Sequence, residues 1–137
     1  MPRNKRLPGI SIVGLGYVGL ATAVCFASRG YRVFGVEIDE RKCELIRSGK
    51  SPIHEQGIDS GLKECIDDGS FSCSSDFHDA VLNSGITFLT VGTPSNSSGE
   101  IDLKYIESAS HQVGSAIKEK SAYHLVVVKS TVIPGTT

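Results

Sequence analysis

The sequence predicts an α/β fold in which a parallel β-sheet is covered by helices on both faces. Short runs of β-branched residues alternate with longer segments of helical periodicity, which is the pattern of successive βαβ units. A glycine-rich turn follows the first of these runs and opens the first helix. A chain of 137 residues can bury the core of one such domain and is too short for a second, so residues 1–137 are expected to form one domain.

Five short apolar runs are predicted to form the strands of the sheet. They cover residues 10–13, 32–36, 71–74, 86–91 and 125–129. Runs of this length that are bounded by turn residues are typical of strands buried on both faces of a parallel sheet.

The segments between these runs carry the signals of helices. Residues 18–29 are small and apolar, and Gly30 after them suits the left-handed turn that ends a helix. Asp39 is expected to cap a second helix that runs to Ser48. Apolar residues at helical spacing indicate three further helices. The first contains Ile58, Leu62 and Ile66, and the second, capped by Asp76, contains Phe77, Ala80 and Val81. The third follows Asp102 and contains Leu103, Ile106, Val113 and Ile117.

The turn after the first strand has the spacing GxGxxG, formed by Gly14, Gly16 and Gly19. Gly14 permits the tight turn, Gly16 lets backbone approach a pyrophosphate, and Gly19 lets the helix pack closely on the strand. The helix N-terminus would then face the anion with its free N–H groups, so no lysine is needed in the turn. The alternative for a pattern of this kind is a compact turn without a ligand.

An acidic residue at the end of the second strand supports a dinucleotide as the ligand. Glu37 follows Gly19 by 18 residues, close to the offset at which a carboxylate binds the adenosine ribose. A carboxylate there favours NAD over NADP, and the alternative is a solvated residue at a strand end. Asp39 is the weaker candidate because it suits the helix cap. The sequence therefore predicts a Rossmann-like, doubly wound sheet that binds NAD.

Composition argues against several other classes. Lys and Arg number 14 against 15 Asp and Glu, so no overall field would attract nucleic acid or an anionic membrane. No apolar run approaches the length of a membrane span or of a secretory signal, so a cytoplasmic location is expected, and the basic residues 1–6 are expected to be a loose terminus. Dispersed histidines predict no metal site, and the cysteines, including Cys25 against the sheet, are expected to be buried thiols.

Several segments together resemble the UDP-glucose/GDP-mannose dehydrogenase family in order and spacing. GLGYVGLATAVCFASRGYRVFGVEID resembles the family's opening, including Tyr17 and Val18 within the glycine motif. GKSPIHEQGI resembles a loop with a Glu-Pro-Gly core, although Gln56 replaces the usual Pro. VGTPSNSSGEIDLKYIESA and KSTVIPGTT resemble two later motifs. Glu37 stands where Asp is commoner, which preserves the acceptor and lengthens its reach.

The resemblance implies roles for the residues that follow the later strands. Gly92, Thr93 and Pro94 are expected to meet the cofactor where the fourth strand ends, with a purely structural Thr-Pro turn as the alternative. Lys129, Ser130 and Thr131 are expected beside the nicotinamide. Thr131 is the candidate catalytic residue, because this family uses the threonine to position a water.

Two further positions have open interpretations. Lys42 faces the adenosine ribose or a phosphate by resemblance, or it is a solvated helix lysine. Glu55 orders a loop over the cofactor, or it is simply exposed.

The resemblance further implies the N-terminal part of an enzyme that oxidises a UDP- or GDP-hexose to the uronic acid with two NAD. Its catalytic cysteine would lie beyond Thr137, so this chain is expected to bind NAD without catalysing the reaction. The implied partners are a nucleotide sugar and a second subunit in a homodimer. The alternatives are a stand-alone NAD-sensing module and a methyltransferase that uses S-adenosylmethionine.

Overall fold

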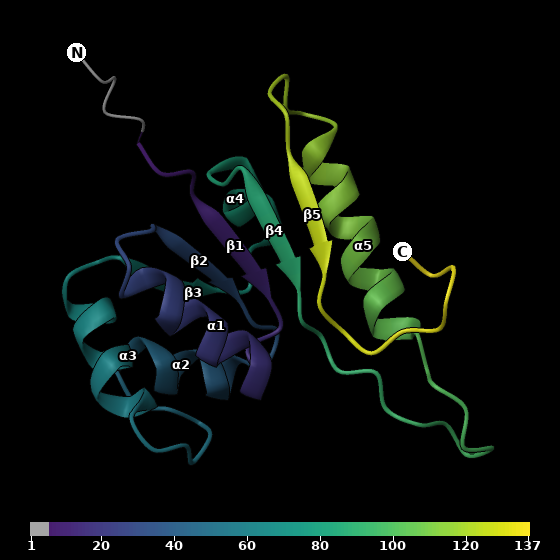
Figure 1. Ribbon diagram of the computed structural model, residues 1–137, viewed down its shortest axis with the longest axis horizontal. Coiled ribbons are helices and arrows are strands. Elements are labelled where there is room, and N and C mark those ends of the chain that lie inside the picture. Colours follow the sequence, from purple (N-terminus) through teal and green to yellow (C-terminus); the bar gives the residue numbers. More distant parts are fainter. Residues whose placement is uncertain (1–5) are drawn as a thin grey trace.

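The computed structural model describes residues 6–137, so most of the basic start at residues 1–6 lies outside the described residues. The sheet has five parallel strands in the order β3-β2-β1-β4-β5 (Figure 1). The strands are β1 (Ile10–Val13), β2 (Val33–Val36), β3 (Phe71–Ser74), β4 (Ile86–Leu89) and β5 (Leu125–Val128). The chain moves outward from β1 to β3 and then returns to the other side of β1. This reversal of strand order confirms the predicted Rossmann-like sheet.

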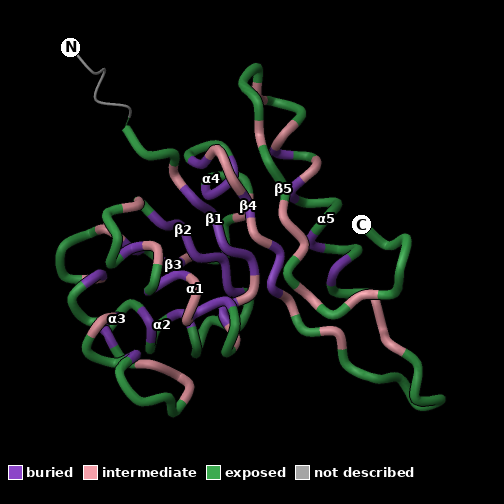
Figure 2. The backbone as a smooth tube through the Cα atoms, viewed as in Figure 1, coloured by how far each residue is buried: buried purple, intermediate pink, exposed green. Residues whose placement is uncertain are grey.

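Within residues 6–137, five helices cover the two faces of the sheet, as the sequence predicts. They are α1 (Tyr17–Ala27), α2 (Glu40–Arg47), α3 (Ile58–Asp67), α4 (Phe77–Leu82) and α5 (Lys104–Ile117). Ile10 and Ile12 of β1 pack in one core with α1, α2 and α3, whereas Val13 packs in a second core with α4 and α5. Burial is deepest along β1 and β2 and least along β5 (Figure 2). The alternation of side chains along the central strand therefore serves two separate helix layers.

Element ends differ from the predicted ones by a few residues. One of the largest differences is at β4, which ends at Leu89, whereas residues 86–91 were expected to be extended. The Thr90 amide still donates to the carbonyl of Val13 at 2.9 Å, but the Thr90 hydroxyl bonds to the carbonyls of Val13 and Gly14 at 3.0 and 2.7 Å. These side-chain contacts hold the chain against the glycine turn, where regular pairing stops.

Helix α1 ends at Ala27, because a turn with Gly30 at a φ of 87° replaces its expected last residues. Asp39 and Asp76 do cap α2 and α4, accepting from the amides of Arg41 and Asp79 at 3.0 Å each. The predicted cap positions are thus confirmed.

The expectation for the cysteines is right for three thiols and wrong for one. Cys43, Cys65 and Cys73 are buried, whereas Cys25 is exposed on α1 and contacts an Arg29 guanidinium nitrogen at 2.6 Å. Helix α1 is apolar around most of its circumference, so composition does not indicate which side faces the sheet. The exposed side carries Cys25, and the buried side carries Leu20, Ala23 and Val24.

A chain of polar side chains crosses the sheet at the N-terminal ends of its strands. Ser84 Oγ donates to Ser11 Oγ at 3.0 Å, Ser11 Oγ lies 2.5 Å from Thr87 Oγ1, and Thr87 Oγ1 lies 2.8 Å from His124 Nε2. The Nδ1 atom of His124 is buried without a hydrogen-bond partner, and Lys120 donates to the carbonyl of Ser84. Burial first, and the charge of Lys120 second, lower the pKa of His124 below its ordinary 6.5.

This arrangement predicts a loss of stability in mild acid. The unfolded chain binds a proton at His124 more readily than the folded chain. Above the unfolded pKa of 6.5, protonation of His124 therefore takes nothing from the free energy of unfolding. The free energy of unfolding declines as the pH falls through 6.5 towards the lower pKa of His124 in the folded chain. Thermal unfolding between about pH 7.5 and about pH 5.5 should show a smaller decline for His124→Gln than for the unaltered chain. His111→Gln, at an exposed site on α5, is the control, and an equal decline in all three chains would contradict the prediction.

Candidate cofactor site

A cleft of about 790 Å³ opens at the C-terminal ends of β1, β2, β4 and β5. It lies where the strand order reverses between β1 and β4, which is the position at which open α/β sheets bind ligands (Figure 1). The structure brings together here nearly all the residues singled out from the sequence. The lining includes Gly14, Gly16, Tyr17, Val18, Glu37, Lys42, Gly92, Thr93, Pro94, Lys129, Ser130 and Thr131.

The three motif glycines have three different environments. Gly14 has a φ of 92°, and a Cβ atom there would come within 2.9 Å of the Val91 backbone. A Cβ atom on Gly19 would collide with the carbonyl oxygen of Gly14, so this glycine lies beneath the cleft and does not line it. Gly16 has no atom within 4 Å of an added Cβ. The fold therefore requires glycine at the outer two positions, while the middle glycine faces open space.

Helix α1 begins in this open space. Its N-cap is Gly16, which provides no side-chain cap, and its first turn has no acidic residue. The amides of the first turn carry the positive end of the helix dipole and have no intrahelical partners. An anion in the cleft can accept these hydrogen bonds without competition from a protein side chain.

Glu37 is buried, with 7% of its surface exposed, so the solvated alternative is wrong. One carboxylate oxygen accepts from the Leu15 amide at 3.1 Å, and the other accepts from the Asp39 amide at 3.0 Å. The carboxylate thus joins the glycine turn to the turn that starts α2. Each oxygen keeps lone-pair capacity for another donor, so a ligand hydroxyl can bind without breaking these bonds.

The far end of the cleft is formed where β4 and β5 end. Ser130 Oγ donates to the carbonyl of Val91 at 2.8 Å, which fixes the spacing of the two strand ends. Thr93 and Thr131 lie on the cleft wall beyond this contact, with Thr131 exposed. This end can therefore present hydroxyl groups to a bound ligand.

One wall of the cleft was not predicted from the sequence. It consists of Tyr105, Ser108 and Gln112 on α5, together with Phe77 at the start of α4. The three α5 residues follow one another at helical spacing along a single stripe beside the buried face. Only the apolar periodicity of α5 was used in the prediction, and the polar stripe next to it was the available signal.

The two positions with open interpretations lie in different places, and both interpretations of Lys42 stay predictions. Lys42 is exposed on α2 and lines the cleft, so its amine can reach a ligand there. Glu55 is exposed in the loop before α3 and lies outside the lining, in agreement with the simpler alternative.

Two absences are established for residues 6–137. No three His, Cys, Asp or Glu side chains of this part of the chain are grouped so that they could hold a metal ion. None of its helices combines the length and the apolar character that crossing a membrane requires.

Comparison with known proteins agrees with this geometry. Residues 9–137 match the UDP-glucose/GDP-mannose dehydrogenase family, NAD binding domain. GDP-mannose 6-dehydrogenase of Pseudomonas aeruginosa is 50% identical over 127 residues, which is 93% of this chain and 29% of that protein. UDP-glucose 6-dehydrogenase of Haloferax volcanii is 41% identical over 128 residues, again 93% of this chain and 29% of that protein.

Solved structures give the same result. The ternary complex of GDP-mannose dehydrogenase from P. aeruginosa superposes with a TM-score of 0.91, covering 93% of this chain and 29% of that one. UDP-glucose dehydrogenase from Pyrobaculum islandicum, 42% identical, superposes with a TM-score of 0.93 over 100% of this chain and 32% of that one. The chain thus spans about a third of its relatives' length. Because residues 9–137 match the family's model, the chain belongs to the UDP-glucose/GDP-mannose dehydrogenase family as an NAD-binding domain.

Proposed function

We propose that this chain is the cofactor-binding part of a nucleotide-sugar 6-dehydrogenase, which oxidises a UDP- or GDP-hexose to the uronic acid with two NAD. The observation that carries the proposal is the buried Glu37 carboxylate, which is bonded to the glycine turn and lies beside the uncapped start of α1. This pairing of an acceptor for a ribose with donors for a pyrophosphate fits a dinucleotide. It fits neither a lone phosphate nor a lone sugar.

The residues present fit NAD from one end of the cleft to the other. Amides of the first turn of α1 would hold the pyrophosphate next to Gly16, where an added Cβ atom would meet no other atom within 4 Å. Glu37 would accept from the adenosine ribose hydroxyls, with Lys42 beside it. The wall formed by Phe77 and Tyr105 would receive the adenine ring.

The nicotinamide end would lie towards Thr93 and Thr131. When bound there, NAD supplies the hydride acceptor, and the protein's part is to orient it and to exclude bulk solvent. The Thr131 hydroxyl is the candidate for holding a water near the reacting carbon. None of the four cysteines lines the cleft, so we assign no nucleophile to residues 6–137.

Calorimetric titration with NAD⁺, NADP⁺ and S-adenosylmethionine tests this proposal. We expect saturable binding of NAD⁺ and at least about tenfold weaker binding of NADP⁺, because the 2′-phosphate would meet the buried Glu37 carboxylate. S-adenosylmethionine should give no saturable heat, because it has no pyrophosphate for the α1 amides. Tighter binding of S-adenosylmethionine than of NAD⁺ by a folded chain would overturn the proposal.

A further inference from the structure

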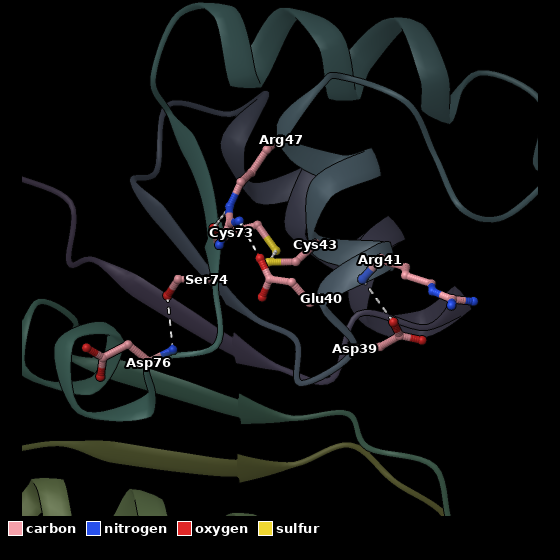
Figure 3. A network of polar contacts seen from close by, with 8 residues as sticks. All are labelled: Asp39, Glu40, Arg41, Cys43, Arg47, Cys73, Ser74 and Asp76. Carbon is pink, nitrogen blue, oxygen red and sulfur yellow. Dashed lines mark hydrogen bonds and ion pairs between the residues drawn. The ribbon is translucent and has the colours of Figure 1, made fainter.

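Two buried thiols lie in contact behind the proposed ribose site. Cys43 of α2 and Cys73 of β3 are 0% and 6% exposed, and their Sγ atoms are 2.8 Å apart (Figure 3). They are 30 residues apart in sequence. Neither lines the cofactor cleft, and nothing in the proposed function uses them.

The geometry favours a covalent link between these sulfurs. A disulfide has an S–S length of about 2.05 Å, so closing it from 2.8 Å requires the sulfurs to approach by less than an ångström. The backbones that carry them already pack together, since α2 lies against β3. Arg47 Nε also donates to the Cys73 carbonyl at 2.9 Å, which holds the end of α2 on the same strand.

A charged group accompanies the pair. The Arg47 guanidinium is held by the Glu40 carboxylate at 2.8 Å, on the side of the thiols (Figure 3). Burial, and next the contact with Cys43, raise the pKa of the Cys73 thiol, while the charge of Arg47 acts in the opposite direction. Burial therefore keeps the Cys73 thiol protonated, and the short Sγ–Sγ distance, rather than a lowered pKa, is the observation that supports a link between the two sulfurs.

We propose that Cys43 and Cys73 are a site of reversible oxidation, at which a hydroperoxide converts the pair into an intramolecular disulfide. One thiol attacks the peroxide oxygen, which forms a sulfenic acid and releases an alcohol or water. The second thiol then displaces water from the sulfenic sulfur, so two thiols and one peroxide give one disulfide, with both sulfurs oxidised and the O–O bond reduced. A dithiol reductant reverses the link by exchange.

The link would join the two segments that hold Glu37. Cys43 is in the first turns of α2, after Asp39, whose amide donates to the Glu37 carboxylate. Cys73 precedes Ser74, whose carbonyl accepts from the Glu37 amide at 2.9 Å. Oxidation would therefore fasten α2 to β3 behind the ribose site and restrict the unfolded chain.

The test treats the 137-residue chain, carrying Cys25→Ser to remove the exposed thiol, with hydrogen peroxide and then with dithiothreitol. Intact mass should fall by two hydrogen atoms, digestion should yield one peptide pair that joins Cys43 to Cys73, and the melting temperature should rise by at least about 5 °C. Dithiothreitol should restore both starting values.

Matched variants give this test its specificity. Cys43→Ser and Cys73→Ser, each confirmed to be folded, should show neither the mass loss nor the thermal shift. Cys65→Ser removes a buried thiol whose Sγ lies 3.6 Å from Ser28 Oγ, and it should behave as the parent does. Addition of oxygen without the linked peptide pair, or a link that involves Cys65, would overturn the proposal. These readouts do not depend on NAD⁺ binding.

Discussion

Replacing Gly16 with alanine is expected to abolish NAD⁺ binding while leaving the melting temperature almost unchanged. Gly16 has an ordinary φ of −76°, and an added Cβ meets no atom within 4 Å, so the fold itself tolerates alanine. The methyl group would instead occupy the space in which the pyrophosphate approaches the α1 amides. We expect at least about a hundredfold loss of affinity, which calorimetry can measure.

Gly19→Ala is the matched control for this prediction, because it should lower the melting temperature, whereas Gly16→Ala should lower the affinity for NAD⁺. The added Cβ would collide with the carbonyl oxygen of Gly14 and lie 2.7 Å from the Thr90 hydroxyl. Forcing α1 away from β1 should cost about 1–3 kcal/mol or more, seen as a lower melting temperature. Full NAD⁺ affinity in a folded Gly16→Ala chain would show that the pyrophosphate lies elsewhere.

The second large effect is expected from Glu37→Gln. The change keeps the size of the side chain but removes its charge and replaces one acceptor with a donor that faces a backbone amide. Loss of charge-assisted hydrogen bonds to the ribose should weaken NAD⁺ binding about 10- to 100-fold. The preference for NAD⁺ over NADP⁺ should also narrow, because the repulsion of the 2′-phosphate is reduced.

Asp39→Asn distinguishes the two acidic candidates. Asparagine still caps α2, since its side-chain oxygen can accept from the Arg41 amide. We expect NAD⁺ affinity within about threefold of the unaltered chain. A larger loss from Asp39→Asn than from Glu37→Gln, measured by the same titration, would assign the ribose to Asp39 instead.

The sequence was sufficient for the elements and for one half of the site, because these depend on local patterns. Glycine spacing, capping by Asp39 and Asp76, and short apolar runs each act within a few residues. The position of Glu37 follows from the same local order, since it stands at the end of a strand beside the glycine turn.

The remaining features depend on contacts between distant segments. The bonds from Leu15 and Asp39 to Glu37, and the meeting of Cys43 with Cys73, come from packing that no local pattern records. The cleft wall on α5 was missed because a polar stripe at helical spacing, such as the one that includes Gln112, is also typical of a solvated helix face. Cys25 was misplaced because α1 is apolar on several sides.

The most direct test of the central claim is to locate NAD⁺ on the chain by ¹H–¹⁵N NMR titration. We predict the largest shifts at the amides of Leu15, Gly16 and Tyr17, with further shifts at Gly92 and Thr93. The amides of His78 and Glu119, which line a separate groove over α4 and α5, should change little. Unchanged Leu15, Gly16 and Tyr17 amides at saturating NAD⁺, or largest shifts in that groove, would contradict the placement of the cofactor.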